Sequence, residues 1–258
     1  MAQSENGEVP GDEVFGGLTI LAQLYANGLG VAKNLDLATH YACNIEGANA
    51  EVDGRVTHLA EIKAKGPGKT RFDFCDDITS GLAQGYCADR AQTLTNARRQ
   101  GGLNALTARV TPAARPVYAR LRKAAETFAS LHGDNETDLS GTGRAAFSIE
   151  ATEEERNLFA KTLRALLDGK IAPAKPAQAR AADDALNASW RKLRAHGQKV
   201  QTYGTVTLDD VVQAQRAWIA YRDAFTAFAR AQGPGRPADG LFVRVTRDRI
   251  ATLDGLPG

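Results

Sequence analysis

Apolar residues recur at intervals of three and four positions along most of this chain of 258 residues, and this spacing constrains the fold more than any other feature. In TEEERNLFAKTLRALLDGKI, for example, Leu163, Leu166 and Leu167 fall on one helical face. Thr152 is the expected N-cap of that helix, and Gly169 follows its expected end. Alternating apolar and polar residues, which indicate strands, are nearly absent. We therefore predict an all-α fold.

Breaks in this pattern divide the chain into segments. We expect a disordered N-terminus over residues 1–14 and a helix pair over residues 15–62. A first helical unit over residues 71–171 and a second over residues 183–258 follow, joined by a linker rich in proline and alanine over residues 172–182. The two units are expected to be helical hairpins in tandem, with the N-terminal pair packed on them.

An internal repeat supports the tandem arrangement. The segment that starts at Ala114 aligns with the one that starts at Ala214, and Tyr118 aligns with Trp218. The distinctive identities are an arginine, a phenylalanine and a glycine: Arg122 and Arg222, Phe128 and Phe228, Gly133 and Gly233. Two related helical hairpins account for this similarity most simply.

The repeated arginines are predicted to clamp helices together. Arg122 and Arg222 each follow an aromatic residue, Trp218 in the second case, by one helical turn, so the guanidinium can pack on the ring and reach an acceptor. For Arg222 the nearest acceptors are Asp183, Asp184 and Asn187 of the preceding helix. Partner binding and catalysis are the alternatives for this arginine.

The cysteines indicate an oxidising compartment. Cys75 and Cys87 bracket a short, turn-rich stretch, which suits a disulfide that closes a small loop. Metal binding is the alternative, but the chain has no CxxC and its four histidines are scattered. A disulfide implies a periplasmic or secreted protein. Cys43 is then either a free thiol or part of an intermolecular bridge.

The N-terminus and the charge limit the remaining classes. MAQSENGEVPGDEVF has no signal-peptide pattern, which taken literally indicates the cytosol, but a methionine before AQSEN also results when a signal peptide has been removed. The cysteines favour the second reading. The 32 basic and 30 acidic residues nearly balance, so we expect no nucleic-acid partner. No apolar run approaches the roughly 20 residues of a membrane span.

The helix pair near the N-terminus resembles a single Sel-type, tetratricopeptide-like repeat. The residues that match its pattern in whole or in part are Leu24, Tyr25, Gly28, Gly30, Val31, Asp36 and Ala38. The resemblance implies either a partner-binding surface or a module that only packs. A lone repeat cannot bury its own apolar face, so we favour packing.

The C-terminal third resembles the LprI-type lysozyme-inhibitor family. DDALNASW, QAQRAWIAYRDAF and TRDRIATL carry its pattern, on Asp183, Leu186, Asn187, Gln215, Arg216, Trp218, Tyr221, Arg222, Asp223, Thr246, Arg249 and Leu253. CDDITSGLAQGYC and NETDLSGTGRAA look like the first unit of longer members of this family. The resemblance implies an extracytoplasmic protein that binds a lysozyme.

The chain departs from the family pattern in four places. Trp190 replaces a tyrosine and Val245 a leucine. Two cysteines that are usual in the family are both missing, at Thr226 and Leu241. Their joint absence is what we expect if they form one disulfide in relatives, so it bears on stability more than on function.

No catalytic motif is present. The chain lacks a nucleophile motif such as GxSxG and a metal spacing such as HExxH, so we expect no catalytic residue, no metal and no cofactor. Adjacent aspartates, as at 76–77, 183–184 and 209–210, do not face each other on a helix. Two carboxylates across a cleft, the arrangement of a glycosidase, are not excluded by sequence.

The stretch GDNETDLSGTGRAAF, residues 133–147, is the candidate binding loop. Asp138, Ser140, Thr142 and Arg144 are its expected partner-binding residues, because small polar side chains beside glycines form an exposed, adaptable loop. Arg144 would meet a catalytic acid of a lysozyme in a charge-assisted hydrogen bond. The alternative is a plain connection, in which Asp138 or Ser140 caps the next helix and Arg144 forms an internal ion pair.

Three functions compete. The first is an inhibitor of a lysozyme or related peptidoglycan hydrolase, including the immunity partner of a secreted toxin. The second is an envelope adaptor or scaffold that docks proteins through the Sel-type repeat. The third is a hydrolase that acts on peptidoglycan. The target enzyme and the oligomeric state are not determined by the sequence.

Overall fold

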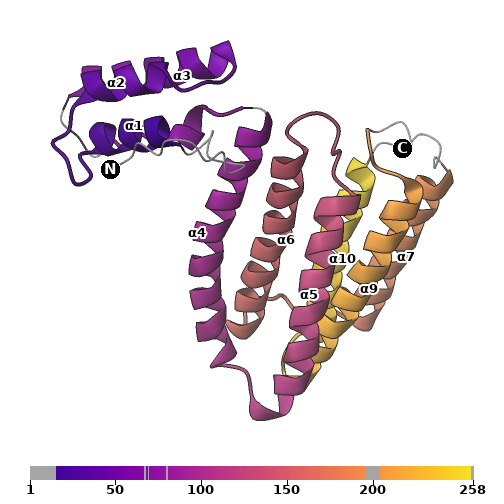
Figure 1. Cartoon of the computed structure of the whole chain (residues 1–258). Coiled ribbons are helices and arrows are strands. Elements are labelled where there is room, and N and C mark those ends of the chain that lie inside the picture. Colours follow the sequence, from indigo (N-terminus) through magenta and orange to yellow (C-terminus); the bar gives the residue numbers. More distant parts are fainter. Residues whose placement is uncertain (1–15, 67, 69, 80, 196–203, 257–258) are drawn as a thin grey trace. The chain divides into compact units, whose positions relative to one another are not determined.

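The computed structural model describes residues 16–66, 68, 70–79, 81–195 and 204–256, and every regular element within them is helical (Figure 1). The predicted all-α fold is therefore confirmed. The chain divides into two compact units, residues 1–87 and 88–258. The expectation of disorder over residues 1–14 concerns positions outside the described ranges.

The first unit begins with the two expected helices, α1 (Gly17–Asn27) and α2 (Leu35–Cys43). Gly28 ends α1 with a φ of 66°, a conformation that costs a glycine little. Asn34 caps α2 by accepting a hydrogen bond from the Leu37 N–H. The rings of Tyr25 and Tyr41 stack with centroids 5.8 Å apart, so the two helices share an aromatic and alanine-rich interface.

A third helix that the sequence pattern did not reveal completes this unit: α3 (Asn49–Lys65). It buries Leu59 in the same apolar cluster as the short 3₁₀ helix η1 (Phe74–Asp77). The predicted disulfide between Cys75 and Cys87 is confirmed, and Cys43 is an exposed free thiol. That α1 and α2 form a Sel-type repeat stays a prediction.

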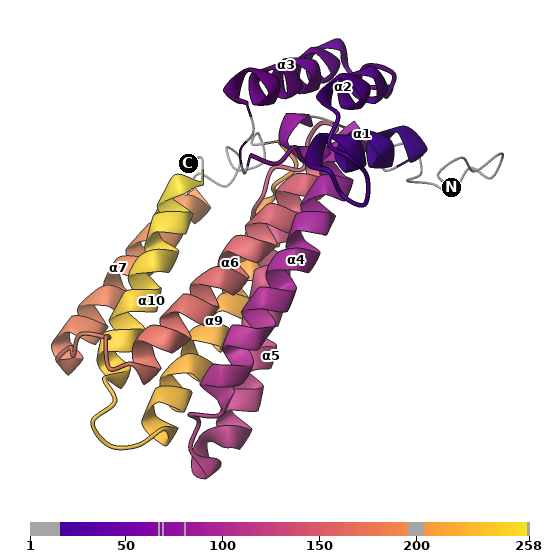
Figure 2. The ribbon, with the colours of Figure 1, turned by 90° about the vertical axis from the view of Figure 1, so that its left-hand side faces the viewer.

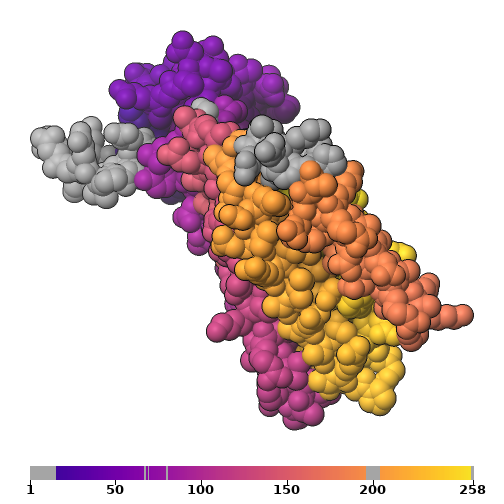
Figure 3. Space-filling model, turned by 90° about the vertical axis from the view of Figure 1, so that its right-hand side faces the viewer, coloured from indigo at the N-terminus to yellow at the C-terminus, as the bar shows by residue number. Residues whose placement is uncertain are grey.

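The second unit is a helical bundle (Figures 1 and 2). Its elements are α4 (Gly81–Thr107), which starts in the first unit, η2 (Pro112–Ala114), α5 (Arg115–Asn135), α6 (Arg144–Leu167), α7 (Pro176–Ala195), α9 (Leu208–Ala231) and α10 (Ala238–Gly255). In this bundle α6 packs on α5, α5 on α9, α9 on α10 and α10 on α7. One face consists largely of α9 and α7 (Figure 3).

The expected boundaries between units change accordingly. The regions proposed as two tandem units, residues 71–171 and 183–258, contribute to one shared apolar core rather than to two. The first compact unit extends to Cys87, beyond the expected end of the helix pair at residue 62. The common descent of the two halves stays a prediction.

The repeated helices α5 and α9 form the centre of this core. They run antiparallel, because Tyr118 near the start of α5 contacts Phe228 near the end of α9, with ring centroids 5.4 Å apart. Farther along, Phe128 stacks on Tyr221 at 5.7 Å. Aromatic pairs in these offset geometries add to the stability from buried area alone.

Two sequence-based helix boundaries are wrong. Thr152, the expected N-cap, lies buried inside α6, which starts eight positions earlier at Arg144. Residues 176–182, expected to be linker, form the first turns of α7, where Pro176 occupies a position that tolerates proline and the following alanines favour a helix. Thr207, in contrast, caps α9 in a capping box with Asp210.

The crossing of α5 and α6 explains why Thr152 cannot be a cap. A Cβ atom on Gly133 would lie 2.1 Å from the Thr152 hydroxyl oxygen and 2.6 Å from the Ser148 carbonyl oxygen. The two helices therefore approach closely only because Gly133 has no side chain. Gly233, its counterpart in the repeat, instead follows the end of α9 with a φ of 131°.

Candidate functional site

The candidate loop connects the end of α5 to the start of α6, over residues 136–143. Ser140, Gly141, Thr142 and Arg144 are exposed, and Phe147 on the first turns of α6 is 38% exposed. The sequence therefore identified a surface segment correctly. Gly143 precedes the helix, so the alternative in which Asp138 or Ser140 caps α6 is wrong.

Asp138 fastens this loop to the turn before α9. Its carboxylate accepts hydrogen bonds from the Ser140 N–H at 2.9 Å, the Ser140 hydroxyl at 2.8 Å and the Thr205 N–H at 3.1 Å. The Thr205 hydroxyl in turn accepts from the Leu139 N–H at 2.8 Å. Hydrogen bonds from Ser140, and then from Thr205, hold the pKa of Asp138 below its usual range. Asp138 was one of four residues expected to bind a partner, and in the structure its side chain instead holds the loop in shape.

The turn beneath the loop requires a glycine. Gly204 has a φ of 53°, and a Cβ atom there would lie 1.8 Å from a carboxylate oxygen of Asp138. Both the backbone conformation and the close approach exclude a larger side chain. The loop is therefore held against the start of α9 by a tightly fitted contact.

Arg144 is free to meet a partner. Its guanidinium has one weak intramolecular contact, to the Gly141 carbonyl oxygen at 3.5 Å. Within the described residues it has no ion-pair partner, so the internal ion pair considered from the sequence is not present. An exposed, unpaired guanidinium beside the exposed ring of Phe147 is a suitable handle for a carboxylate-lined surface.

A buried ion pair anchors the loop from below. Glu136, the first loop residue, has a fully buried side chain and accepts two hydrogen bonds from Arg249 of α10, both at 2.6 Å. Arg249 is 2% exposed, and its Nε donates to the Gln215 side-chain oxygen of α9 at 2.7 Å. The guanidinium also lies over the Phe128 ring at 5.5 Å. One arginine therefore ties α5, α9 and α10 together at the base of the loop.

The environment of Glu136 keeps it charged. Burial by itself would raise the pKa of its carboxyl group, but hydrogen bonds from Arg249 and His132, together with the positive charge of Arg249, outweigh burial and lower it. Glu155, half-buried nearby on α6, accepts no such hydrogen bonds from the residues that the structure describes, and burial raises its pKa. Two glutamates in one neighbourhood thus differ in the sign of their pKa shift.

The second arginine cluster matches the expected clamp in position. Arg222 donates to Asp183 of α7 at 2.9 Å and to Asp223 at 2.9 Å. Its guanidinium lies 5.2 Å from the Trp218 ring and 4.7 Å from the Phe242 ring. Its contribution to stability stays a prediction.

The two other expected members of the clamp are less central. Asn187 contacts Asp183 rather than Arg222, at 3.4 Å. Arg122, the repeat counterpart, has one side-chain hydrogen bond to the described part of the chain, to Gln100 at 3.4 Å. The repeat therefore preserves the residue without preserving its contacts.

Within the described residues, the two carboxyl groups whose pKa burial raises on α6 and α10 do not line a cleft large enough for a sugar. Glu155 and Asp248, whose pKa values are raised by burial, line a cavity of about 30 Å³ together with Tyr221. Such a cavity holds a water or two and excludes a sugar ring. Across the described ranges no three metal-binding side chains converge, and no helix there is long and apolar enough to cross a membrane.

Residues 174–253 match the family model for the lysozyme inhibitor LprI. This is a family of inhibitors and not of enzymes. The matched segment contains α7, α9 and α10, and with them Asp183, Gln215, Arg222 and Arg249. None of the curated proteins and none of the solved structures matches the chain.

The extent of the LprI match explains which residues of the buried ion pair the sequence indicated. Gln215 and Arg249 were recognised as family residues, but their partner Glu136 lies outside the matched segment and was not singled out. No local pattern marks it, because it is 113 positions from Arg249 in the sequence. The LprI segment thus supports a loop that the upstream part of the chain supplies.

Proposed function

We propose that this chain is an extracytoplasmic inhibitor of a lysozyme or a related peptidoglycan hydrolase. The match of residues 174–253 to a lysozyme-inhibitor family carries this proposal. The helices of that segment provide Arg249 and Gln215, which hold Glu136 at the base of the exposed loop. The proposed inhibitory element is therefore built on family residues, although its own sequence lies upstream of them.

The loop has the properties that insertion into an enzyme cleft requires. Glycoside hydrolases place two carboxyl groups across their cleft, and one of them is ionised in the resting enzyme. Arg144 carries the matching charge, and the exposed Ser140 and Thr142 supply hydroxyl groups beside it. Because Asp138 and Glu136 already order the loop, little conformational entropy is lost when it binds.

The proposed compartment is the periplasm or the extracellular space. The Cys75–Cys87 disulfide persists only under oxidising conditions, which the periplasm and the extracellular space provide. A peptidoglycan hydrolase acts in those places. The proposal includes hydrolases that are delivered as secreted toxins, for which this chain would be the immunity protein.

The test is peptidoglycan clearing by chicken-type and goose-type lysozymes and by a bacterial lytic enzyme, each titrated with the full chain. We expect inhibition of one class to saturate near one-to-one. Clearing that is unaffected in all three titrations argues against the proposed function.

Variants then test the loop. Arg144→Ala removes a charge-assisted hydrogen bond to the enzyme and should weaken inhibition about tenfold or more. Arg120→Ala is the matched control. Arg120 is also exposed, but along α5 it lies about 24 Å from Glu136, where the loop begins. Undiminished inhibition by both Arg144→Ala and Ser140→Ala would reject the loop and leave the inhibitor function standing.

A further inference from the structure

A groove of about 760 Å³ lies between α4, α5 and α6 of the second unit. Its volume falls in the range of sites for small ligands. Its lining includes Gln92, Asn96 and Gln100 of α4, Arg122 and Lys123 of α5, and Phe159 of α6. None of these residues belongs to the loop or to the LprI-matched segment, so neither part of the inhibitor proposal uses the groove.

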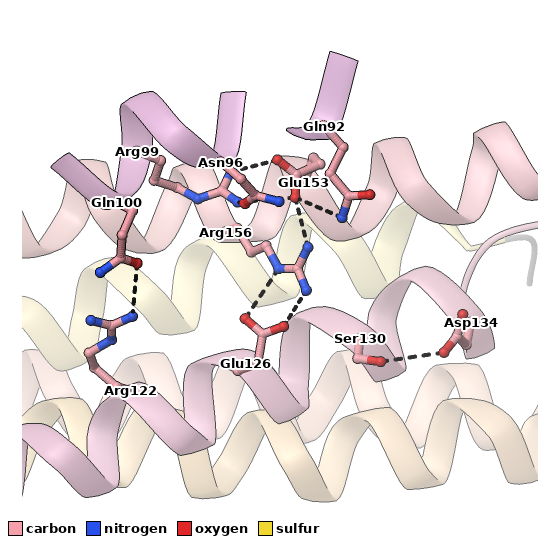
Figure 4. Close-up of polar contacts among 10 residues, drawn as sticks. All are labelled: Gln92, Asn96, Arg99, Gln100, Arg122, Glu126, Ser130, Asp134, Glu153 and Arg156. Atoms are coloured by element: carbon pink, nitrogen blue, oxygen red, sulfur yellow. Dashed lines mark hydrogen bonds and ion pairs between the residues drawn. The ribbon is translucent and has the colours of Figure 1, made fainter. Parts of the chain in front are cut away.

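Side chains from the three helices bridge this groove (Figure 4). Glu153 on α6 binds Arg99 of α4 at 2.6 Å and Arg156 at 2.8 Å, and Arg156 continues to Glu126 of α5. Burial alone would raise the pKa of Glu153, but the hydrogen bonds from Arg99 and Arg156 lower it. Glu153 is therefore ionised, and the two arginines pair with it and with Glu126.

Two further positive charges, both on α5, line the groove. Arg122 and Lys123 have no carboxylate partner within the described part of the chain. Arg122 instead reaches the Gln100 side chain across the groove at 3.4 Å (Figure 4). As neighbours on a helix they leave the backbone in different directions, but both long side chains line the groove, so their charges suit a ligand with a single carboxylate.

A row of amide side chains extends from these cations along α4. Gln92, Asn96 and Gln100 repeat every four residues, so they lie on one helical face and span about 12 Å. Part of this row is used inside the protein, because Gln92 donates to Glu153, Asn96 accepts from Arg99, and Gln100 accepts from Arg122 and donates to Asn104. Each amide has an oxygen and two N–H groups, so the Gln92 oxygen and the remaining N–H groups of Asn96 and Gln100 are left to contact a ligand. Hydroxyl groups also donate and accept, so a ligand with several hydroxyl groups complements this row. Leu103 and Phe159 also line the groove, but both belong to the buried core, so the polar side chains supply most of its accessible surface.

We propose that this groove binds an oligosaccharide that carries a carboxylate. The amide row contacts its hydroxyl groups, and Arg122 with Lys123 holds the carboxylate. An acidic peptide fits less well, because its several carboxylates would need more unpaired cations than these two residues provide. The site acts independently of any inhibition by the loop.

The test is calorimetric titration of the full chain with the disaccharide N-acetylglucosaminyl-N-acetylmuramic acid, which has one carboxylate. Chitobiose, of similar size but without a carboxylate, is the comparison ligand. We expect saturable binding of the acidic disaccharide and binding of chitobiose weaker by about tenfold or more. The double variant Arg122→Ala with Lys123→Ala should lose that preference, whereas Asn96→Ala should weaken both sugars.

Two controls separate a binding defect from other effects. Arg191→Ala removes an exposed arginine of α7, and Arg144→Ala removes the loop arginine; both should bind the disaccharide as the unmodified chain does. Circular dichroism verifies that each variant is folded. The proposal is overturned by no saturable binding up to about 10 mM, by equal binding of chitobiose, or by tighter binding of a pentaglutamate peptide.

Discussion

Replacing Glu136 by glutamine should destabilise the second unit by about 3 kcal/mol, since it leaves the buried charge of Arg249 unpaired. The pair is bidentate at 2.6 Å, and both side chains are at most 1% exposed, so water cannot replace the lost carboxylate. Loss of one partner of a buried pair costs about 3–5 kcal/mol, and the retained shape of glutamine places this change near the lower end.

Denaturant unfolding followed by tryptophan fluorescence measures this loss in the second unit alone, because Trp190 and Trp218 both belong to it. The corresponding fall in melting temperature is about 6–12 °C for a unit of this size. The pKa of Glu136 is lowered in the folded state, so the stabilisation is present above the unfolded pKa of about 4.3 and is lost as the pH falls through the folded value. The difference between the two proteins should therefore shrink in acid.

A paired substitution tests the reasoning further. Glu136→Leu combined with Arg249→Met removes both charges and should recover much of the stability that the single glutamine variant loses. A loss below about 1 kcal/mol for Glu136→Gln, or a loss that does not change between neutral and acidic pH, would refute the account of a charged, unpaired arginine.

Three more outcomes follow from the structure. Glu155→Gln should raise the melting temperature at neutral pH, because burial raises the pKa of this carboxyl group. The gain should vanish below about pH 4, where the carboxyl group is protonated in both the folded and the unfolded chain. A variant that melts at a lower temperature than the unmodified chain would contradict this. Arg222→Ala should cost about 2 kcal/mol of unfolding free energy, whereas Arg122→Ala, with its single polar contact, should cost under about 0.5. Reduction of Cys75–Cys87 should weaken the first unit by about 3 kcal/mol; hydrogen exchange in α1 to α3 should accelerate, and unchanged exchange there would count against it.

Features that depend on neighbouring residues followed from the sequence. The all-α fold came from helical periodicity, and the disulfide from two close cysteines. Asp183 was one of three acceptors expected for Arg222, since a helix and the one before it in a hairpin bring such residues together. In each case a few positions carry the necessary information.

Features that depend on how helices cross were decided by the tertiary structure. The start of α6 at Arg144 went unseen because Thr152 resembles a cap until the approach of Gly133 buries it. The groove exists because three helices diverge, which no single periodicity encodes. The pairing of Glu136 with Arg249 spans 113 positions, and its energy comes from the removal of both charges from water. Burial of that kind belongs to the assembled bundle, whereas the sequence alone determined which helices were available to build it.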